Sequence, residues 1–317
     1  MQIALIGIGK IANYQMQAIT HTKGIKLVDA HDLDPNKAEE LPGSVHFHEN
    51  LEKMLQKSKA DAFLVSTPTN AHFEVAMQVI ESDRIAIVEK PLCTSQSEMD
   101  ALLTAARTRK LPLYTAFHPA YGREVDWWRE QRDASNFDLG ELLGFDTCFA
   151  DPYYIDGKLT LGAVGKAGAW TDSGASGLSA LSRLIDLATM KLVDGRMTII
   201  PSLDCAQVQG LGIYSFATEG RTGYGTVDTN WTLGKNYKTT HLRYENGTVE
   251  LDHAREIALL RMTGQEKLSF NLATDKPRLV NHYCGVFADL TAKYSQGEDN
   301  TELSEVLHRL LFAAMTH

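Results

Sequence analysis

Residues 3–12 read Ile-Ala-Leu-Ile-Gly-Ile-Gly-Lys-Ile-Ala, and this stretch determines the class of fold. Its first four residues are apolar, which predicts a short strand buried on both faces of a parallel sheet. The glycines follow at once, and residues 14–19 then show helical spacing. Gly7 permits a tight turn, Gly9 lets the backbone approach a pyrophosphate, and Ala12 lets helix and strand pack closely. The order strand, glycine turn, helix therefore predicts a dinucleotide-binding unit with the phosphates at the helix N-terminus.

An acidic residue follows the second predicted strand, which covers residues 25–30. Such a residue, roughly twenty residues past the glycines, accepts hydrogen bonds from the adenosine ribose hydroxyls. Asp32 fits that position. Its charge would repel a 2′-phosphate, and Leu33 supplies no arginine to balance one, so we expect NAD rather than NADP. The alternative for Asp32 is a plain turn or cap residue before Pro35.

Alternating strands and helices continue to about residue 117. Apolar runs at 62–66, 85–88 and 113–117 predict buried strands, and residues 71–80 and 95–109 have helical periodicity. This alternation predicts an α/β fold with a doubly wound parallel sheet, whose ligand lies outside the carboxyl ends of the strands. The residues at those ends include Asp32, Thr67, Lys90 and His118.

Lys90 and His118 are candidates for moving a proton at this edge. Lys90 follows a buried strand and precedes Pro91, which biases it away from helix and fixes the direction in which the chain leaves the strand. A lysine beside a nicotinamide ring can shuttle the substrate proton. The alternative for Lys90 is a solvated surface lysine. His118 could act on the same proton, bind a sugar hydroxyl, or be purely structural.

The composition excludes several classes of partner. The chain has 317 residues, of which 44% are hydrophobic and 22% charged, and this length suggests two domains. A net charge of −9 argues against nucleic acid. No apolar run reaches the ~18 residues of a membrane span. The first residues lack a signal peptide's basic segment and cleavage site, so we expect no membrane partner and a cytoplasmic location.

Metal and disulfide chemistry are not expected either. The four cysteines lie far apart, so they form no CxxC pair and are expected to be buried thiols. The histidines are scattered, and the pair at residues 46 and 48 has no third ligand nearby. We therefore expect no metal site. The cysteines are Cys93, Cys148, Cys205 and Cys284.

Three motifs together resemble one oxidoreductase family. They are Gly-Ile-Gly-Lys-Ile-Ala at 7–12, Ser-Thr-Pro-Thr-Asn-Ala-His at 66–72 and Val-Glu-Lys-Pro-Leu at 88–92. The family is that of glucose–fructose oxidoreductase and inositol dehydrogenase (Gfo/Idh/MocA). Residues 168–176 also look like the start of its second-domain helix, which has an Asp-x-Gly-x-His pattern. Within the family, the sequence is most similar to bacterial aldose 1-dehydrogenases acting on galactose or arabinose.

The resemblance implies a Rossmann domain followed by an α+β domain with an open, mostly antiparallel sheet. We expect the nucleotide domain at 1–120 and the substrate-binding and oligomerisation domain at 121–317. The exposed face of such a sheet commonly forms the subunit interface, which implies a homodimer or homotetramer. The sequence agrees in general, because strands are predicted at the following ranges: 142–149, 207–216, 225–233, 239–244 and 249–251, the last two joined by an Asn-Gly turn.

The implied activity is hydride transfer from the anomeric carbon of an aldose to NAD(P), which gives an aldonolactone. The resemblance implies catalytic roles for Lys90 and Asp172, to which we add His118. Substrate-binding residues are expected to be Ser176, Trp170 and Asn230. Cofactor contacts are expected at Gly7, Gly9, Lys10, Ile11, Asp32, Thr67, Pro68, Asn70, His72, Glu89 and Lys90.

One position departs from the family pattern. Residue 176 is commonly His in the family and Asn in the arabinose-type enzymes, but here it is serine. A serine can bond a sugar hydroxyl, yet it is no base near neutral pH, so the proton transfer shifts toward Lys90 with Asp172, a water or His118. The alternative role of Asp172 is to cap the helix. Trp170 either lines the substrate pocket or packs in the core.

Two other functions stay open. The same fold can oxidise a ring hydroxyl of an inositol or a sugar derivative, although the inositol-type members use the histidine that is absent here. The chain could also be a non-catalytic, NAD-bound sugar sensor. Retention of Lys90 and Asp172 argues against a sensor.

Overall fold

The strands expected to be buried on both faces form one parallel sheet in the computed structural model. The structure describes residues 1–201, 206–218 and 220–316, so Cys205 lies outside the described residues. The sheet has the order β3-β2-β1-β4-β5-β6. Its strands are β1 (Gln2–Ile6), β2 (Lys26–His31), β3 (His46–His48), β4 (Ala62–Val65), β5 (Ile85–Glu89) and β6 (Leu113–Ala116). All four residues of β4 and β6 are buried, as their apolar sequences predict.

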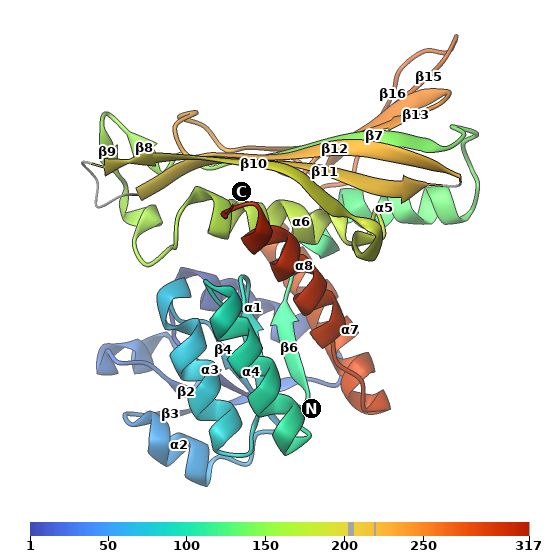
Figure 1. Ribbon diagram of the computed structural model, residues 1–317. Coiled ribbons are helices and arrows are strands. Elements are labelled where there is room, and N and C mark those ends of the chain that lie inside the picture. Colours follow the sequence, from blue (N-terminus) through green and yellow to red (C-terminus); the bar gives the residue numbers. More distant parts are fainter. Residues whose placement is uncertain (202–205, 219, 317) are drawn as a thin grey trace. The chain divides into compact units, whose positions relative to one another are not determined.

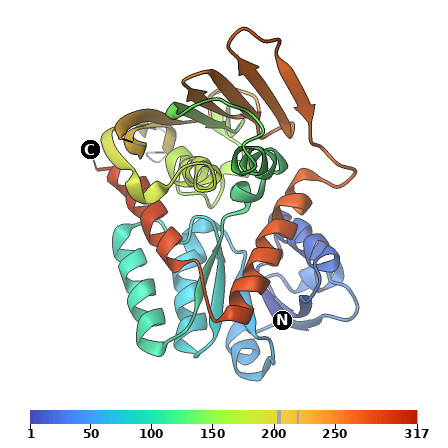
Figure 2. The same ribbon diagram turned by 90° about the vertical axis from the view of Figure 1, so that its right-hand side faces the viewer.

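Helices lie on both faces of this sheet. They are α1 (Lys10–His21), α2 (Leu51–Lys57), α3 (His72–Glu81), α4 (Gln96–Arg109) and α7 (Arg278–Gln296). In Figure 2, α7 runs beside α1 on the face opposite α3 and α4. The Ser95 hydroxyl caps α4 by accepting a hydrogen bond from the Glu98 backbone N–H. The predicted doubly wound parallel sheet is therefore confirmed.

The chain divides into two compact units, and the division is not a single cut. The first unit comprises Met1–His118 and Leu279–Glu305, and the second comprises Pro119–Arg278 and Val306–His317. The expected domains, 1–120 and 121–317, differ because α7 returns to the first unit. There the Tyr283 hydroxyl bonds Glu89, and the Asp299 carboxylate accepts from the Leu113 backbone N–H. No local pattern marks such a return.

The second unit is built on a large sheet of order β10-β11-β12-β7-β13-β14-β15-β16. Neighbouring strands are antiparallel except β12 and β7. Helices α5 (Arg123–Asp133) and α6 (Ala175–Leu181) lie on one face, as Figure 1 shows with the sheet seen nearly edge-on. The expected open, mostly antiparallel sheet is thus confirmed. Its strands are β7 (Leu142–Ala150), β10 (Lys191–Ile200), β11 (Ala206–Thr218), β12 (Arg221–Asn230), β13 (Tyr237–Tyr244), β14 (Gly247–Asp252), β15 (Ile257–Met262) and β16 (Leu268–Asn271).

Short elements complete the chain. A small hairpin pairs β8 (Tyr154–Ile155) with β9 (Lys158–Leu159), and α8 covers Thr301–Ala313. The strand predicted to reach residue 233 ends at Asn230. The reason is local, because the Asn230 side-chain oxygen accepts hydrogen bonds from the backbone N–H and hydroxyl of Thr232 and so turns the chain.

Candidate functional site

The glycine turn after β1 has the shape that a pyrophosphate requires. Gly7 has φ +92°, and a Cβ there would lie 2.9 Å from the Ser66 backbone, so only glycine fits. A Cβ on Gly9 would meet nothing within 4 Å. Gly9 is also the N-cap of α1, where no side chain caps the helix and no acidic residue occupies the first turn. The helix N-terminus is therefore open to an anion, which fits the phosphates of a dinucleotide.

Asp32 lies beside this turn at the end of β2. One carboxylate oxygen accepts a hydrogen bond of 2.6 Å from the Ile8 backbone N–H, and the other accepts one of 2.9 Å from Asp34 N–H. The side chain thus fixes the glycine turn and keeps an acidic group at the end of the strand. An acidic group in this place fits the ribose hydroxyls of an adenosine.

The turn after β4 carries two side-chain hydroxyls whose hydrogen bonds are not satisfied by the described residues. Ser66 Oγ and Thr67 Oγ1 are buried and have no hydrogen-bond partner among the described residues. A buried hydroxyl without a partner costs about 1–3 kcal/mol, so these groups fit a bound polar ligand. Pro68 and Asn70 of the same turn are exposed.

His72 connects this turn to the one after β5. Its ring nitrogens lie 2.7 Å from the Pro91 carbonyl oxygen and 3.0 Å from that of Thr67. The ring is 1% exposed, so it ties together two loops at the edge formed by the carboxyl ends of the parallel strands. We call this edge of the first sheet the nucleotide edge. This placement favours support of the cofactor loops over direct contact with the cofactor.

Glu89 is the last residue of β5, and Lys90 follows it at the same edge of the sheet. The Glu89 carboxyl is buried, and its Oε1 accepts hydrogen bonds of 2.7 Å from Gln15 Nε2 and 2.7 Å from the Tyr283 hydroxyl. Burial raises its pKa to about 7, although both of these donors and the Lys90 ammonium oppose the shift. Lys90 itself is half-buried, and its peptide bond to Pro91 is cis.

His118, just beyond β6, belongs to an aromatic and imidazole cluster with α7. Its Nδ1 lies 3.4 Å from Nδ1 of His282, and its ring centroid lies 5.2 Å from that of Tyr283. The histidines look scattered along the sequence, yet these two rings lie together. His118 and His282 are 164 positions apart in the chain, so the sequence offers no local signal for this pair.

Asp172 occupies a π-helical turn, Trp170–Gly174, directly before α6. Single π-turns are frequent at functional sites. The Asp172 side chain is 6% exposed, and its Oδ2 lies 2.8 Å from the Lys166 ammonium. The Ser176 hydroxyl donates to the Asp172 carbonyl oxygen at 3.1 Å. The predicted residues 172 and 176 are therefore adjacent, and Lys166 is a partner that sequence reasoning missed.

A second lysine–aspartate pair lies in the same unit. Lys238 Nζ is 2.5 Å from Asp151 Oδ1, and the two side chains are 11% and 14% exposed. Burial lowers the pKa of the Lys238 ammonium, an effect that the attraction of Asp151 only partly opposes. The other Asp151 oxygen accepts from the Ser173 hydroxyl, which in turn accepts from the Trp231 indole N–H. This network fixes the turn that carries Asp172.

Two predicted substrate residues have other roles in the structure. Trp170 is 0% exposed, and its indole N–H donates to the Leu311 carbonyl oxygen at 2.8 Å. Its ring also packs on β11, where a Cβ on Gly210 would lie 2.7 Å from it. Trp170 is thus a core residue with no surface left for a substrate. Asn230 is half-buried and closes the turn after β12 with its side-chain oxygen.

We expect Trp170→Phe to separate packing from substrate binding. The variant keeps most of the ring volume but loses the hydrogen bond to the Leu311 carbonyl, which should lower the free energy of unfolding by about 1–3 kcal/mol. The substrate KM should stay within about twofold of the wild type, because the ring has no exposed atom. Urea unfolding and steady-state kinetics measure the two quantities. A large rise in KM without a loss of stability would restore Trp170 to the substrate site.

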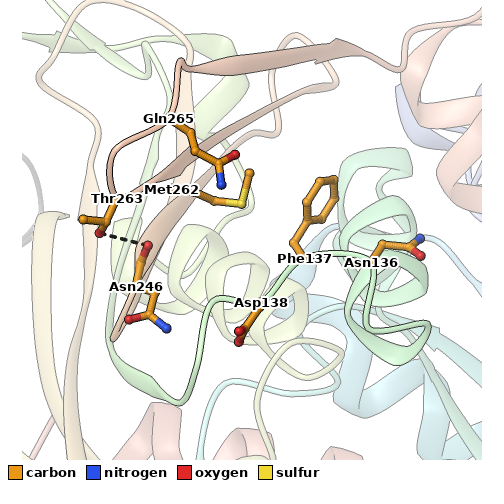
Figure 3. A pocket seen from close by; sticks show the side chains of 7 residues that line it. All are labelled: Asn136, Phe137, Asp138, Asn246, Met262, Thr263 and Gln265. Carbon is orange, nitrogen blue, oxygen red and sulfur yellow. Dashed lines mark hydrogen bonds between the residues drawn. The ribbon is translucent and has the colours of Figure 1, made fainter.

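The second unit has a pocket in another place (Figure 3). It is lined by Asn136, Phe137, Asp138, Asn246, Met262, Thr263 and Gln265. These residues lie just before β7, at the β13–β14 turn, and at the end of β15 with the turn that follows it, whereas Asp151 follows the end of β7. The length of a strand separates the two places, so we do not assign this pocket to the chemistry.

Neither a metal-binding cluster nor a membrane-spanning helix occurs in the described residues. Within 1–201, 206–218 and 220–316, no cluster of three His, Cys, Asp or Glu side chains is placed to hold a metal ion. Across the part of the chain that the structure describes, no helix has the length and apolar character needed to cross a bilayer.

The comparisons with known proteins match the fold and the nucleotide edge. Residues 1–117 match the model of the GFO_IDH_MocA family, described as an oxidoreductase family with an NAD-binding Rossmann fold. Residues 1–117 are therefore similar to the NAD-binding Rossmann domain of this oxidoreductase family. This confirms the coarse resemblance, while a specific likeness to aldose 1-dehydrogenases is not shown.

The individual relatives are distant. The chain is 29% identical over 137 residues to a scyllo-inositol 2-dehydrogenase (NAD⁺) of Bacillus subtilis, covering 40% of each chain. It thus spans less than half the length of such a curated relative. A solved oxidoreductase from Agrobacterium radiobacter, in complex with NAD⁺, L-tartaric acid and magnesium, has a TM-score of 0.81 at 15% identity over 100% of this chain and 95% of that one. KijD10, a 3-ketoreductase from Actinomadura kijaniata with TDP-benzene and NADP, has a TM-score of 0.79 at 18% identity over 99% and 96%. These structures show the shared fold.

Proposed function

We propose that the chain is an NAD(P)-dependent dehydrogenase that oxidises the anomeric carbon of a galactose- or arabinose-like aldose to an aldonolactone. The observation that carries the proposal is the edge of the first sheet, where the open glycine turn and Asp32 fit a dinucleotide and Lys90 directly follows β5. The nicotinamide, when bound, accepts the hydride. Lys90 takes the proton of the anomeric hydroxyl.

The second unit supports an uncharged, polyhydroxylated substrate. Asp172 is balanced by Lys166 and Asp151 by Lys238, so each carboxylate has its own ammonium partner. Such pairs offer both acceptors and donors to hydroxyl groups without requiring charge on the ligand. A phosphate would instead need unpaired cations. Ser176 cannot serve as the base, because its hydroxyl is not ionised near neutral pH and donates to a backbone carbonyl.

A second candidate is oxidation of a ring hydroxyl on an inositol or sugar derivative. The similarity to a scyllo-inositol 2-dehydrogenase favours it. Both reactions use the same nucleotide edge and differ in the carbon that loses the hydride. A third possibility, a sugar sensor that binds NAD without turnover, would keep the fold and lose the chemistry.

A substrate panel distinguishes these functions. Nicotinamide absorbance is followed with galactose, fucose, arabinose, xylose, glucose and myo-inositol, each with NAD and with NADP. Reduction with one group of aldoses and a lactone product support the proposal. Reduction with inositol alone would mean that the hydride leaves a ring carbon, and it favours the second candidate. Cofactor binding by calorimetry without reduction by any substrate favours the sensor.

We expect Asp32→Asn to reduce the preference for NAD over NADP. The amide keeps the size of the side chain but removes the charge that repels a 2′-phosphate, so the ratio of NADP to NAD affinity should rise about tenfold. Calorimetric titration with each cofactor measures it. Asp34→Asn, which removes an exposed carboxylate two residues later, is the matched control and should leave the ratio unchanged. An equal response of the two variants would mean that Asp32 does not face the ribose.

We also propose assembly into a homodimer or homotetramer through the face of the large sheet opposite α5 and α6. That face presents Tyr224, which is 58% exposed, while its neighbours on β12, Gly223 and Gly225, are buried. Sedimentation of the wild type and of Tyr224→Asp measures the association. A wild-type protein that sediments as a monomer, with no change in Tyr224→Asp, would contradict the proposed assembly.

A further inference from the structure

The Glu89 carboxyl is held from two sides by elements distant in the sequence. Gln15 lies on α1, the helix whose N-terminus faces the glycine turn, and Tyr283 lies on α7. Both donate to the same oxygen, Oε1, at 2.7 Å. The other oxygen faces the Lys90 backbone N–H at 3.3 Å. Two helices therefore converge on one buried carboxyl at the end of β5.

The place of this carboxyl in the sheet assigns it to one end of the cofactor. Asp32 follows β2, on one side of β1, whereas β4, β5 and β6 lie on the other side. A dinucleotide bound across such a switch point has its adenosine over the β2 side, and its second nucleoside over the β4–β5 side. Glu89 therefore lies at the nicotinamide end.

The charged and titratable groups around Glu89 are few. Lys90 follows it in the chain, Tyr283 bonds it from α7, and Gln15 on α1 is uncharged. Behind Tyr283 are the rings of His118 and His282. Burial raises the pKa of the Glu89 carboxyl to about 7, so it changes charge near neutral pH.

We propose that Gln15 and Tyr283 are positioning residues that hold Glu89 where its charge discriminates between the two redox states of the nicotinamide. The ionised carboxylate stabilises the positively charged oxidised ring, and the protonated carboxyl tolerates the neutral reduced ring. Binding of NAD⁺ then breaks the Glu89 O–H bond and releases that proton to the solvent, whereas binding of NADH does not. The inference rests on the proposed function, because it requires a nicotinamide at this edge.

Calorimetry measures this proton directly. NAD⁺ and NADH are titrated into the protein at pH 6 to 8 in buffers of different ionisation enthalpy, which converts proton release into heat. For the wild type near pH 7 we expect roughly half a proton released per NAD⁺ and none for NADH. For Glu89→Gln we expect no release, and a loss of about tenfold in the preference for NAD⁺ over NADH above pH 7.

Tyr283→Phe tests the positioning role. The Tyr283 hydroxyl lowers the pKa of Glu89, so its removal should raise that pKa further and shift the proton-release profile to higher pH. Tyr294→Phe, on the same helix, removes a tyrosine hydroxyl that does not bond Glu89 and should leave the profile in place. A Tyr283→Phe profile identical to that of the wild type would overturn the positioning role.

The ligand-free protein gives an independent readout. The folded state holds the Glu89 proton more tightly than the unfolded state, because the pKa rises from 4.5 to about 7 on folding. This stabilisation is complete below the unfolded pKa and is lost as pH rises through the folded one. The difference in melting temperature between the wild type and Glu89→Gln should therefore fall as the pH rises from 4.5 to about 7.

The outcomes separate this inference from the proposed function. NAD⁺ binding with proton release, but without oxidation of any sugar, supports the inference and contradicts the dehydrogenase. Sugar oxidation with no proton release between pH 6 and 8 overturns the inference alone. Absence of NAD⁺ binding overturns both.

Discussion

Lys90→Ala is expected to lower the rate of nicotinamide reduction by roughly 10³-fold, the typical contribution of a positioned acid–base group. Lys90 directly follows β5, next to the buried Glu89, at the edge where the glycine turn and Asp32 fit the cofactor. Removal of the ammonium group should therefore lower kcat far more than it raises KM. Absorbance of the reduced nicotinamide, followed with the best sugar of the panel, measures both constants.

Two further variants define what Lys90 contributes. Lys90→Arg keeps the positive charge but cannot release a proton near neutral pH, so it should be nearly as inactive as the alanine variant. Lys59→Ala, at an exposed lysine of the same unit, is the matched control and should retain the wild-type rate. An active arginine variant would show that charge alone is required and would rule out the proton-transfer role.

Lys238→Met is expected to lower the free energy of unfolding by about 3–5 kcal/mol, because it leaves the Asp151 carboxylate buried without its cation. The pair is 2.5 Å apart, and both side chains are more than four-fifths buried. Asp151 also accepts from Ser173 in the turn that carries Asp172, so sugar affinity should fall together with stability. Urea unfolding gives the first quantity and substrate KM the second.

A double-mutant cycle separates the charge from the packing. Asp151→Asn combined with Lys238→Met removes both charges and keeps the hydrogen-bonding shape toward Ser173, so it should recover most of the lost stability. Lys235→Met, three positions earlier and exposed, should change stability by less than about 0.5 kcal/mol. If Lys238→Met cost no more than Lys235→Met, the buried ion pair would contribute nothing to the fold.

The nucleotide edge could be predicted because its chemistry is local in the sequence. The glycine turn, Asp32 and Lys90 each follow a strand that its own apolar run identifies, and parallel strands bring their carboxyl ends to one edge. The strand boundaries agree within two residues for β1, β4, β5 and β6. The sequence could not decide whether Trp170 lines the pocket or packs, since a tryptophan beside an aspartate carries no sign of which way its ring turns. The structure buries this ring completely.

The partners of the predicted residues came from the tertiary structure alone. Gln15 and Tyr283 meet at Glu89 from helices on either end of the chain, and Lys238 reaches Asp151 from β13. These contacts depend on how helices and strands pack. The hydrophobic periodicity of the sequence indicates which face of each element is buried, but not which element packs against that face. The sequence by itself therefore determined the fold class, the nucleotide edge and the residues that mark it. Only the tertiary structure decided which distant groups hold these residues in place and set their charge. The reason is that a buried polar side chain needs a hydrogen-bond partner, and packing determines which residue is close enough to be that partner.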